Sequence, residues 1–301
     1  MKLKLKNREL LLGVAFTSPW LLGMAVFLIY PLAVSLYYSF TDYNLLSRPF
    51  WIGWENYQFA MGDSIFGIVL RNTLVYAAVM IPLNLILGLV LALALSGLKW
   101  TKALSSLVYL PATVPLVVLG LVFQWMYNGE FGIINYLLGA IGLEGPPWLT
   151  TTTWIKPAIG IVNMFLLGPM VLINLAGIQS VPTELYEAVR LETDSKFLQI
   201  WHITLPMISP VILYNLIMQI IGVVQIFDIP YALTAGVGAY STPGGPNYAS
   251  TFYTMYITEV AFKQYDMGYA SALAWMLFLG IALATWLVMT IGRKLVYYAA
   301  E

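Results

Sequence analysis

The sequence predicts an all-α integral membrane protein with six transmembrane helices. Of its 301 residues, 60% are hydrophobic and only 9% are charged, and the mean hydropathy is +0.81. A soluble domain of this length needs far more surface charge than fourteen basic and fourteen acidic residues supply. We therefore expect a lipid bilayer to cover the remaining surface.

Six apolar runs are long enough to cross a hydrocarbon core of about 30 Å, and together they predict a single transmembrane domain over residues 1–301. The runs lie near residues 11–38, 68–98, 104–127, 155–178, 207–233 and 267–291. The first run lacks an A-x-A-like cleavage site and is about twenty residues long or more, which favours a retained span over a signal peptide.

The basic residues predict the orientation, because Lys and Arg accumulate in cytoplasmic loops. Ten of the fourteen precede the first run or follow the second, fourth or sixth: Lys2, Lys4, Lys6, Arg8, Lys99, Lys102, Arg190, Lys196, Arg293 and Lys294. The other four are Arg48, Arg71, Lys156 and Lys263. Both termini and the loop between the fourth and fifth runs are therefore expected in the cytoplasm.

The composition argues against several classes of function. The chain has no Cys, so disulfides, thiolate catalysis and thiolate metal sites are excluded. The single histidine, His202, cannot form a metal site or a catalytic triad by itself. A formal net charge of zero disfavours nucleic acid as a partner. We expect no enzymatic activity and no cofactor in this chain.

Two kinds of residue modify the spans. Prolines such as Pro111, Pro115 and Pro169 remove backbone donors and predict kinks or weakened points. Small residues at Gly88 and Ala92 recur at a spacing that lets helix backbones approach closely.

Polar groups at membrane depth are costly unless they face protein or water. We assign mostly neutral side chains to a solute path: Gln124, Tyr127, Asn163, Tyr214, Asn215, Gln219, Gly222, Gln225 and Asp228. Neutral amides beside aromatic faces suit a polyhydroxylated, uncharged solute better than a cation or a phosphate. Ordinary hydrogen bonding between helices is the alternative, and it applies equally to Asn72, Asn84 and Asn174.

Residues 183–206 form the one long amphipathic segment between two hydrophobic runs. Thr183 can cap a helix whose first turn carries Glu184 and Glu187. A second helix is expected from the helical spacing of Phe197 and Trp201. Two short helices at right angles under the membrane would dock on a partner, or alternatively rest on lipid.

The same segment resembles the EAA loop of bacterial ABC importer permeases, whose pattern is E-A-A, three residues, G, nine residues, I-x-L-P. The resemblance rests on Glu187-Ala188-Val189 and Ile203-Thr204-Leu205-Pro206, with Thr193 at the position of the family's glycine. It implies a pair of coupling helices that dock on an ATPase. The residues assigned to this coupling are Glu184, Glu187, Ala188, Val189, Thr193, Asp194, Phe197, Ile203, Leu205 and Pro206.

Further motifs, among them Tyr109-Leu110-Pro111 and Gly268-Tyr269-Ala270-Ser271-Ala272, look like the maltose and glycerol-3-phosphate type permeases of the sugar-importer branch. The resemblance implies a non-catalytic permease subunit of an ATP-driven, binding-protein-dependent importer for a sugar or oligosaccharide in the bacterial cytoplasmic (inner) membrane. It would work by alternating access and contact membrane lipid. Its implied protein partners are ATP-binding-cassette ATPase subunits that bind ATP-Mg, a second homologous permease and an extracytoplasmic solute-binding protein.

Two alternatives stay open. The importer could carry a non-sugar solute such as glycerol-3-phosphate. An ion-coupled secondary transporter is the other, and it requires intramembrane charge relays. Only Asp228, Glu259, Arg71 and Lys156 offer such charges, and this alternative leaves the amphipathic segment unexplained. The chain has no G-x-x-x-x-G-K-[ST] motif, so energy from ATP would require a separate subunit.

Overall fold

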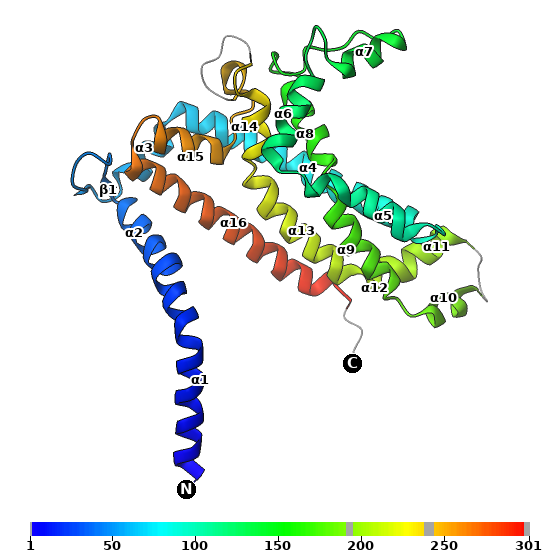
Figure 1. Cartoon of the computed structure of the whole chain (residues 1–301), viewed down its shortest axis with the longest axis horizontal. Coiled ribbons are helices and arrows are strands. Elements are labelled where there is room, and N and C mark those ends of the chain that lie inside the picture. The colour runs from blue at the N-terminus through cyan, green and yellow to red at the C-terminus, as the bar shows by residue number, and fades with distance from the viewer. Residues whose placement is uncertain (1, 191–194, 238–243, 298–301) are drawn as a thin grey trace. The chain divides into compact units, whose positions relative to one another are not determined.

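The computed structural model is mostly helical and describes residues 2–190, 195–237 and 244–297. The chain divides into two compact units. The first contains residues 1–63 and 257–277, and the second contains residues 64–256 and 278–301. Figure 1 labels the elements of both units.

The first unit begins with a long apolar helix. Its elements are α1 (Lys2–Met24), a π-helical turn (Ala25–Ile29), α2 (Tyr30–Tyr38), β1 (Thr41–Asp42), β2 (Phe50–Trp51), α3 (Glu55–Gly62) and the adjoining parts of α15 (Tyr253–Phe262) and α16 (Met267–Leu295). The two strands pair antiparallel, with Thr41 opposite Trp51. The helical stretch Leu12–Tyr38 has a mean hydropathy of 1.9 and 0% buried residues, as a lipid-facing surface requires.

The second unit is a bundle of helices. Its elements are α4 (Ser64–Ser96), α5 (Thr101–Tyr109), a 3₁₀ turn (Leu110–Thr113), α6 (Leu116–Met126), α7 (Ile133–Ala140), α8 (Ile155–Met164), α9 (Gly168–Gln179), α10 (Thr183–Arg190), α11 (Lys196–Gln199), a π-helical turn (Ile200–Thr204), α12 (Leu205–Met207), α13 (Ser209–Val224), α14 (Asp228–Thr234), a 3₁₀ turn (Pro246–Tyr248) and the remaining parts of α15 and α16. Helices α4, α9 and α13 lie side by side (Figure 1).

The predicted spans fall into continuous and bent helices. Leu12–Tyr38, Ser64–Ser96, Ser209–Thr234 and Met267–Lys294 are each long and apolar enough to cross a membrane. The predicted runs 104–127 and 155–178 are instead broken, with bends of 92° between Thr101–Thr113 and Leu116–Met126 and of 45° between Ile155–Met164 and Gly168–Gln179. The described residues therefore contain four candidate spans, or up to six if each bent pair is one span.

A proline explains the first bend, and a close contact between helices lies at the second. Val114 precedes Pro115, and the proline ring disfavours the helical conformation at the preceding residue, so Val114 is extended with φ −80° and ψ 134°. At the second bend, Gly168 lies against the backbone of Val108 and Tyr109, which are the last two residues of α5. A Cβ atom at position 168 would lie 2.6 Å from the Val108 carbonyl oxygen. The bend between α8 and α9 therefore packs against the end of α5, the helix that precedes the 92° bend.

Small residues allow α4 and α9 to approach, as their spacing predicted. A Cβ atom at Gly88 would lie 2.6 Å from Sδ of Met170, and Ala92 is fully buried. The neighbour of this face is therefore α9 of the same chain.

In the first unit, Asp266 caps the start of α16. Its Oδ1 accepts a hydrogen bond from the backbone N–H of Tyr269 at 2.9 Å, and the Tyr269 hydroxyl donates to Oδ2 of Asp63 at 2.8 Å. Burial raises the pKa of Asp266, with a smaller contribution from the charge of Asp42, while the Tyr269 amide opposes the shift.

We predict that Asp266→Asn raises the thermal stability of the detergent-solubilised protein at pH 7. The raised pKa means that ionisation of Asp266 is less favourable in the folded chain, so its contribution to stability is fully present at low pH and is lost as the pH rises through the folded pKa. Asn caps a helix as well as Asp does and carries no charge to bury. The gain should shrink toward pH 4, whereas Asp266→Ala should destabilise by about 1 kcal/mol. An equal melting temperature for the wild type and Asp266→Asn at every pH would contradict this account.

We also predict that Gly168→Ala destabilises the protein by about 1–3 kcal/mol, the range for overpacking a tight contact. Its Cβ would meet rigid backbone, whereas the matched control Gly67→Ala places a Cβ where nothing lies within 4 Å. Thermal melts of both variants check this, and a Gly168→Ala protein that melts with the control would refute the close approach.

Candidate functional site

A set of neutral amides joins three helices of the second unit. Nδ2 of Asn84 on α4 donates to Oδ1 of Asn163 on α8 at 3.0 Å and to Oε1 of Gln219 on α13 at 2.9 Å. Asn84 is only 1% exposed. We call these three residues the amide network.

A second amide pair joins the same helix, α13, to α9. Nδ2 of Asn215 donates to Oδ1 of Asn174 on α9 at 2.8 Å, and both side chains are buried. Asn215 and Gln219 are one helical turn apart, so α13 presents both of its amides to neighbouring helices.

The amide network keeps hydrogen-bonding capacity for a further ligand. Asn163 and Gln219 accept through their carbonyl oxygens, so their amino groups remain as donors on half-buried side chains. Oδ1 of Asn84 is buried without a hydrogen-bond partner. The donors that a ligand could reach are therefore the amino groups of Asn163 and Gln219, and the network carries no charge.

The other residues predicted for a solute path lie elsewhere. Tyr214 and Gly222 are exposed on α13, and Gln225 is exposed just after its end. Gly222 has nothing within 4 Å of an added Cβ. One face of α13 is therefore buried at Asn215, half-buried at Gln219 and exposed at Gly222. Asp228 is half-buried as the first residue of α14.

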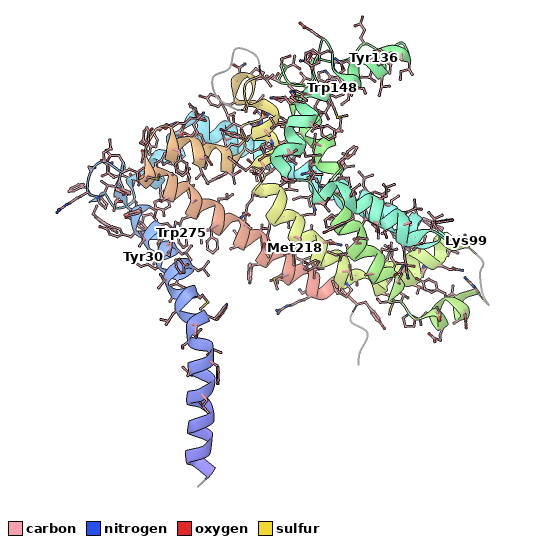
Figure 2. The ribbon with its side chains drawn as sticks, in the orientation of Figure 1. Tyr30, Lys99, Tyr136, Trp148, Met218 and Trp275 are labelled. Atoms are coloured by element: carbon pink, nitrogen blue, oxygen red, sulfur yellow. The ribbon has the colours of Figure 1, made fainter. Side chains whose placement is uncertain are left out.

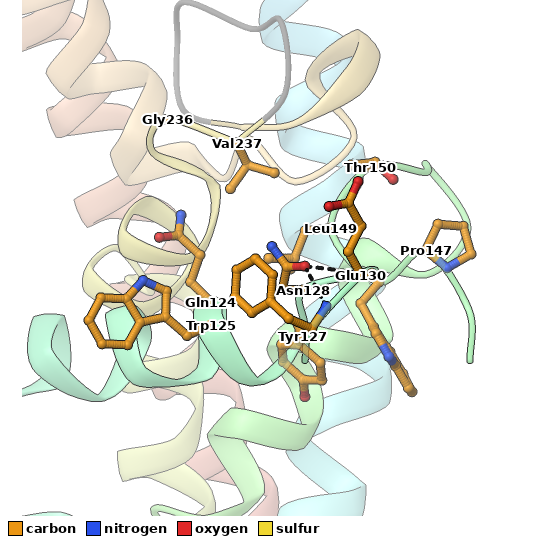
Figure 3. A pocket seen from close by; sticks show the side chains of 13 residues that line it. Gln124, Trp125, Tyr127, Asn128, Glu130, Pro147, Leu149, Thr150, Gly236 and Val237 are labelled. Carbon is orange, nitrogen blue, oxygen red and sulfur yellow. Dashed lines mark hydrogen bonds between the residues drawn. The ribbon is translucent and has the colours of Figure 1, made fainter. Parts of the chain in front are cut away.

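Two predicted path residues lie at the far end of α6, beside a cavity (Figure 3). Nε2 of Gln124 donates to the carbonyl oxygens of Leu233 at 3.3 Å and Ala235 at 2.8 Å. The Tyr127 hydroxyl is buried and donates to the Ala158 carbonyl oxygen at 3.1 Å. The structure does not bring these two residues to the amide network.

Asn72 fits the alternative interpretation, in which an intramembrane polar group serves packing. Its Nδ2 donates to the carbonyl oxygens of Tyr248 at 2.7 Å and Thr251 at 3.2 Å, and its Oδ1 accepts from Nζ of Lys156 at 2.7 Å. These bonds use both ends of the amide to hold a loop against α4 and α8.

The amphipathic segment 183–206 has an anchored side. Ile203 is buried in a cluster with Val181 and Ile208, against which Tyr186 and Val189 also pack. The hydroxyls of Tyr186 and Thr204 lie 2.9 Å apart and share a hydrogen bond. This contact fixes α10 against the π-helical turn Ile200–Thr204. The sequence motif did not predict it, because Tyr186 lies outside the E-A-A pattern and Thr204 occupies the unspecified position x of I-x-L-P.

The opposite side of the segment is exposed. Glu184, Glu187, Ala188 and Phe197 are all exposed, and Leu205 and Pro206 are half-buried. The exposed rings of Phe197 and Trp201 are stacked with centroids 6.4 Å apart. The predicted turn residues Thr193 and Asp194 lie outside the described residues. The surface available to a partner therefore combines two carboxylates with two large aromatic rings.

The segment and the cavity lie at opposite ends of the second unit. In Figure 2, Lys99 lies at the end near α11, while Tyr136 and Trp148 lie at the other end, and Figure 1 shows α10 and α7 likewise separated. Among the described residues, no group of three or more His, Asp or Glu side chains could hold a metal ion.

The family model described as "Binding-protein-dependent transport system inner membrane component" matches residues 84–297. This range includes the whole amide network and the whole amphipathic segment.

Two relatives extend the similarity to nearly the full chain. The sulfoquinovosyl glycerol transport system permease protein SmoG of Agrobacterium fabrum is 34% identical over 274 residues, covering 89% of this chain and 86% of that protein. The trehalose/maltose transport system permease protein MalF of Thermococcus litoralis is 32% identical over 296 residues, covering 96% of each.

The fold is also found in a solved structure. A bacterial alginate ABC transporter, solved in complex with alginate pentasaccharide-bound periplasmic protein, contains a chain that matches with a TM-score of 0.84 at 21% identity, over 99% of both chains. The present chain is therefore a non-catalytic, membrane-embedded transport subunit and belongs to the family of binding-protein-dependent transport system inner membrane components.

Proposed function

We propose that this chain is one permease of an ATP-driven importer for a sugar or oligosaccharide, folded as one transmembrane domain with six spans and both termini in the cytoplasm. Counting each bent pair as one span gives six. The basic residue Lys99 lies at the same end of the second unit as the amphipathic segment (Figure 2), in agreement with a cytoplasmic position for both.

The observation that carries the proposal is a helical connection between the amphipathic segment and the amide network. From Lys196 to Val224 the chain is helical except at Ile208. This run begins beside the exposed Phe197 and ends past Gln219. A partner that moves the segment therefore moves a helix that carries two amides of the candidate solute path.

The segment suits an ATPase partner, because this chain lacks a phosphate-binding loop. In the proposed mechanism, ATP binding draws the two ATPase subunits together. The docked segments of this chain and of a second permease follow, and the solute path opens toward an extracytoplasmic binding protein. The alginate transporter, which was solved with its periplasmic protein, provides the precedent for such an assembly.

The amide network suits a saccharide. Hydroxyl groups both donate and accept hydrogen bonds, and the network offers them the amino donors of Asn163 and Gln219. The solutes named for the two relatives, sulfoquinovosyl glycerol and trehalose/maltose, contain saccharide groups. An ion-coupled mechanism is not supported by this network, because none of its members titrates.

We predict that Glu187→Arg weakens co-purification with the ATPase subunit by roughly tenfold or more, since reversal of a charge at an interface replaces attraction with repulsion. The matched control is Glu144→Arg, which reverses an exposed charge in the segment between α7 and α8. Pull-down yields from co-expressed subunits provide the measurement. Solute uptake that persists without the ATPase and depends on an ion gradient would contradict the proposed function.

We predict that Gln219→Leu lowers ATP-dependent uptake in proteoliposomes while leaving ATPase co-purification intact. The substitution removes one bond to Asn84, which costs stability by only about 0.6–2 kcal/mol. The control Met218→Leu changes the exposed neighbouring residue. Unchanged uptake kinetics in Gln219→Leu would assign this amide to packing alone.

A further inference from the structure

The cavity at the end of α6 lies away from the amide network and has the dimensions of a ligand site. Its volume is about 540 Å³, within the range of roughly 300–1,000 Å³ that is usual for small-molecule sites. It lies between the C-terminal end of α6, the segments 128–131 and 147–150, and residues 236–237. Figure 3 shows Gln124 and Trp125 on one wall and Glu130 and Thr150 on the other.

Two aromatic rings line the cavity with free faces. Trp125 is 71% exposed and Phe131 is 72% exposed. Within the described residues, neither ring stacks on another aromatic ring. A flat ring with an electron-rich face attracts the C–H groups on the apolar face of a sugar ring, as it attracts other positively polarised edges.

The polar groups of the cavity are partly fixed and partly free. The bonds from Nε2 of Gln124 to Leu233 and Ala235 orient this side chain and leave its Oε1 as an acceptor. Oδ1 of Asn128 accepts from the backbone N–H groups of Glu130 at 2.9 Å and Phe131 at 3.2 Å, which leaves its amino group as a donor. The exposed carboxylate of Glu130 adds two acceptor oxygens.

The charge of the lining limits the class of ligand. Among the described residues that line the cavity, Glu130 is the only charged one, and no Lys or Arg accompanies it. An acidic saccharide would meet a like charge there without a counter-charge, whereas an uncharged saccharide gains acceptors for its hydroxyls.

We propose that this cavity is an entrance subsite for an uncharged saccharide, which stacks on Trp125 and hydrogen-bonds to Gln124, Asn128 and Glu130. The inference rests on the proposed function, because it assumes that this chain imports a saccharide. The solute would contact the cavity first and the amide network afterwards. The alternative role for Trp125 is to anchor the chain in the headgroup zone of the membrane. That role needs an aromatic ring at this position but involves no saccharide binding.

Binding of maltotriose and of trigalacturonate to the complete transporter in lipid nanodiscs, followed by saturation-transfer NMR titration, tests the subsite. We expect maltotriose to bind more tightly than the acidic trisaccharide. Trp125→Ala should weaken maltotriose binding by roughly three- to tenfold, the range for one aromatic contact. Trp125→Phe should retain most of the affinity. Tyr136→Ala, which removes an exposed ring outside this lining, should match the wild type.

Charge reversal provides the second arm. Glu130→Lys should raise the affinity for trigalacturonate and lower the preference for maltotriose, while Tyr136→Ala should leave both affinities unchanged. Wild-type affinities in both Trp125→Ala and Glu130→Lys would overturn the subsite. If the subsite is overturned but import still requires the ATPase, the proposed importer function stands. Import without the ATPase would overturn the importer function.

Discussion

The bundle depends on one constraint, which is that a buried amide inside a membrane-embedded unit must find its partner within the protein. The amino group of Asn84 meets this constraint by donating to two helices, although its buried Oδ1 has no hydrogen-bond partner. Helices α4, α8 and α13 must therefore meet at a single level, and a shift of α13 by one turn would separate Gln219 from its partner. The pair Asn174 and Asn215 fixes α9 to α13 in the same way.

The position of α13 in turn determines what the amphipathic segment can do. Ile203 and Ile208 are buried where the segment enters α13, and the Tyr186–Thr204 hydrogen bond ties α10 to the same point. The exposed carboxylates and rings therefore stand on a rigid base. A flexible linker at this place would absorb motion of a partner, whereas a packed helical run transmits it. This distinction supports the segment as a mechanical connection more strongly than its motif does.

The sequence predicted the helical class, the positions of the apolar runs and the amphipathic segment, because hydropathy and periodicity are local properties. It also indicated kinks at Pro111, Pro115 and Pro169, and the two bends lie at Pro115 and beside Pro169. It did not predict the sizes of these bends, 92° and 45°, or the contact of Gly168 with the Val108 backbone. Nor could it single out Asn84 among the intramembrane amides, because a hydrogen bond to Gln219, 135 positions away, leaves no trace in local spacing. Ile203 matched a coupling motif, yet its side chain is buried in packing.

In the proposed solute path, the pairing of the amides would allow the path to be polar without holding its solute. An unpaired amide in the bundle would bind a sugar hydroxyl tightly, because the alternative would be an unsatisfied polar group. Gln219 already has Asn84 as a partner, so a hydroxyl that replaces this partner exchanges one hydrogen bond for another at little net gain. Passage through a membrane requires binding that is favourable enough to admit the solute and weak enough to release it. Neutral amides that pair with each other meet both requirements, whereas a fixed charge would have to be neutralised at each passage.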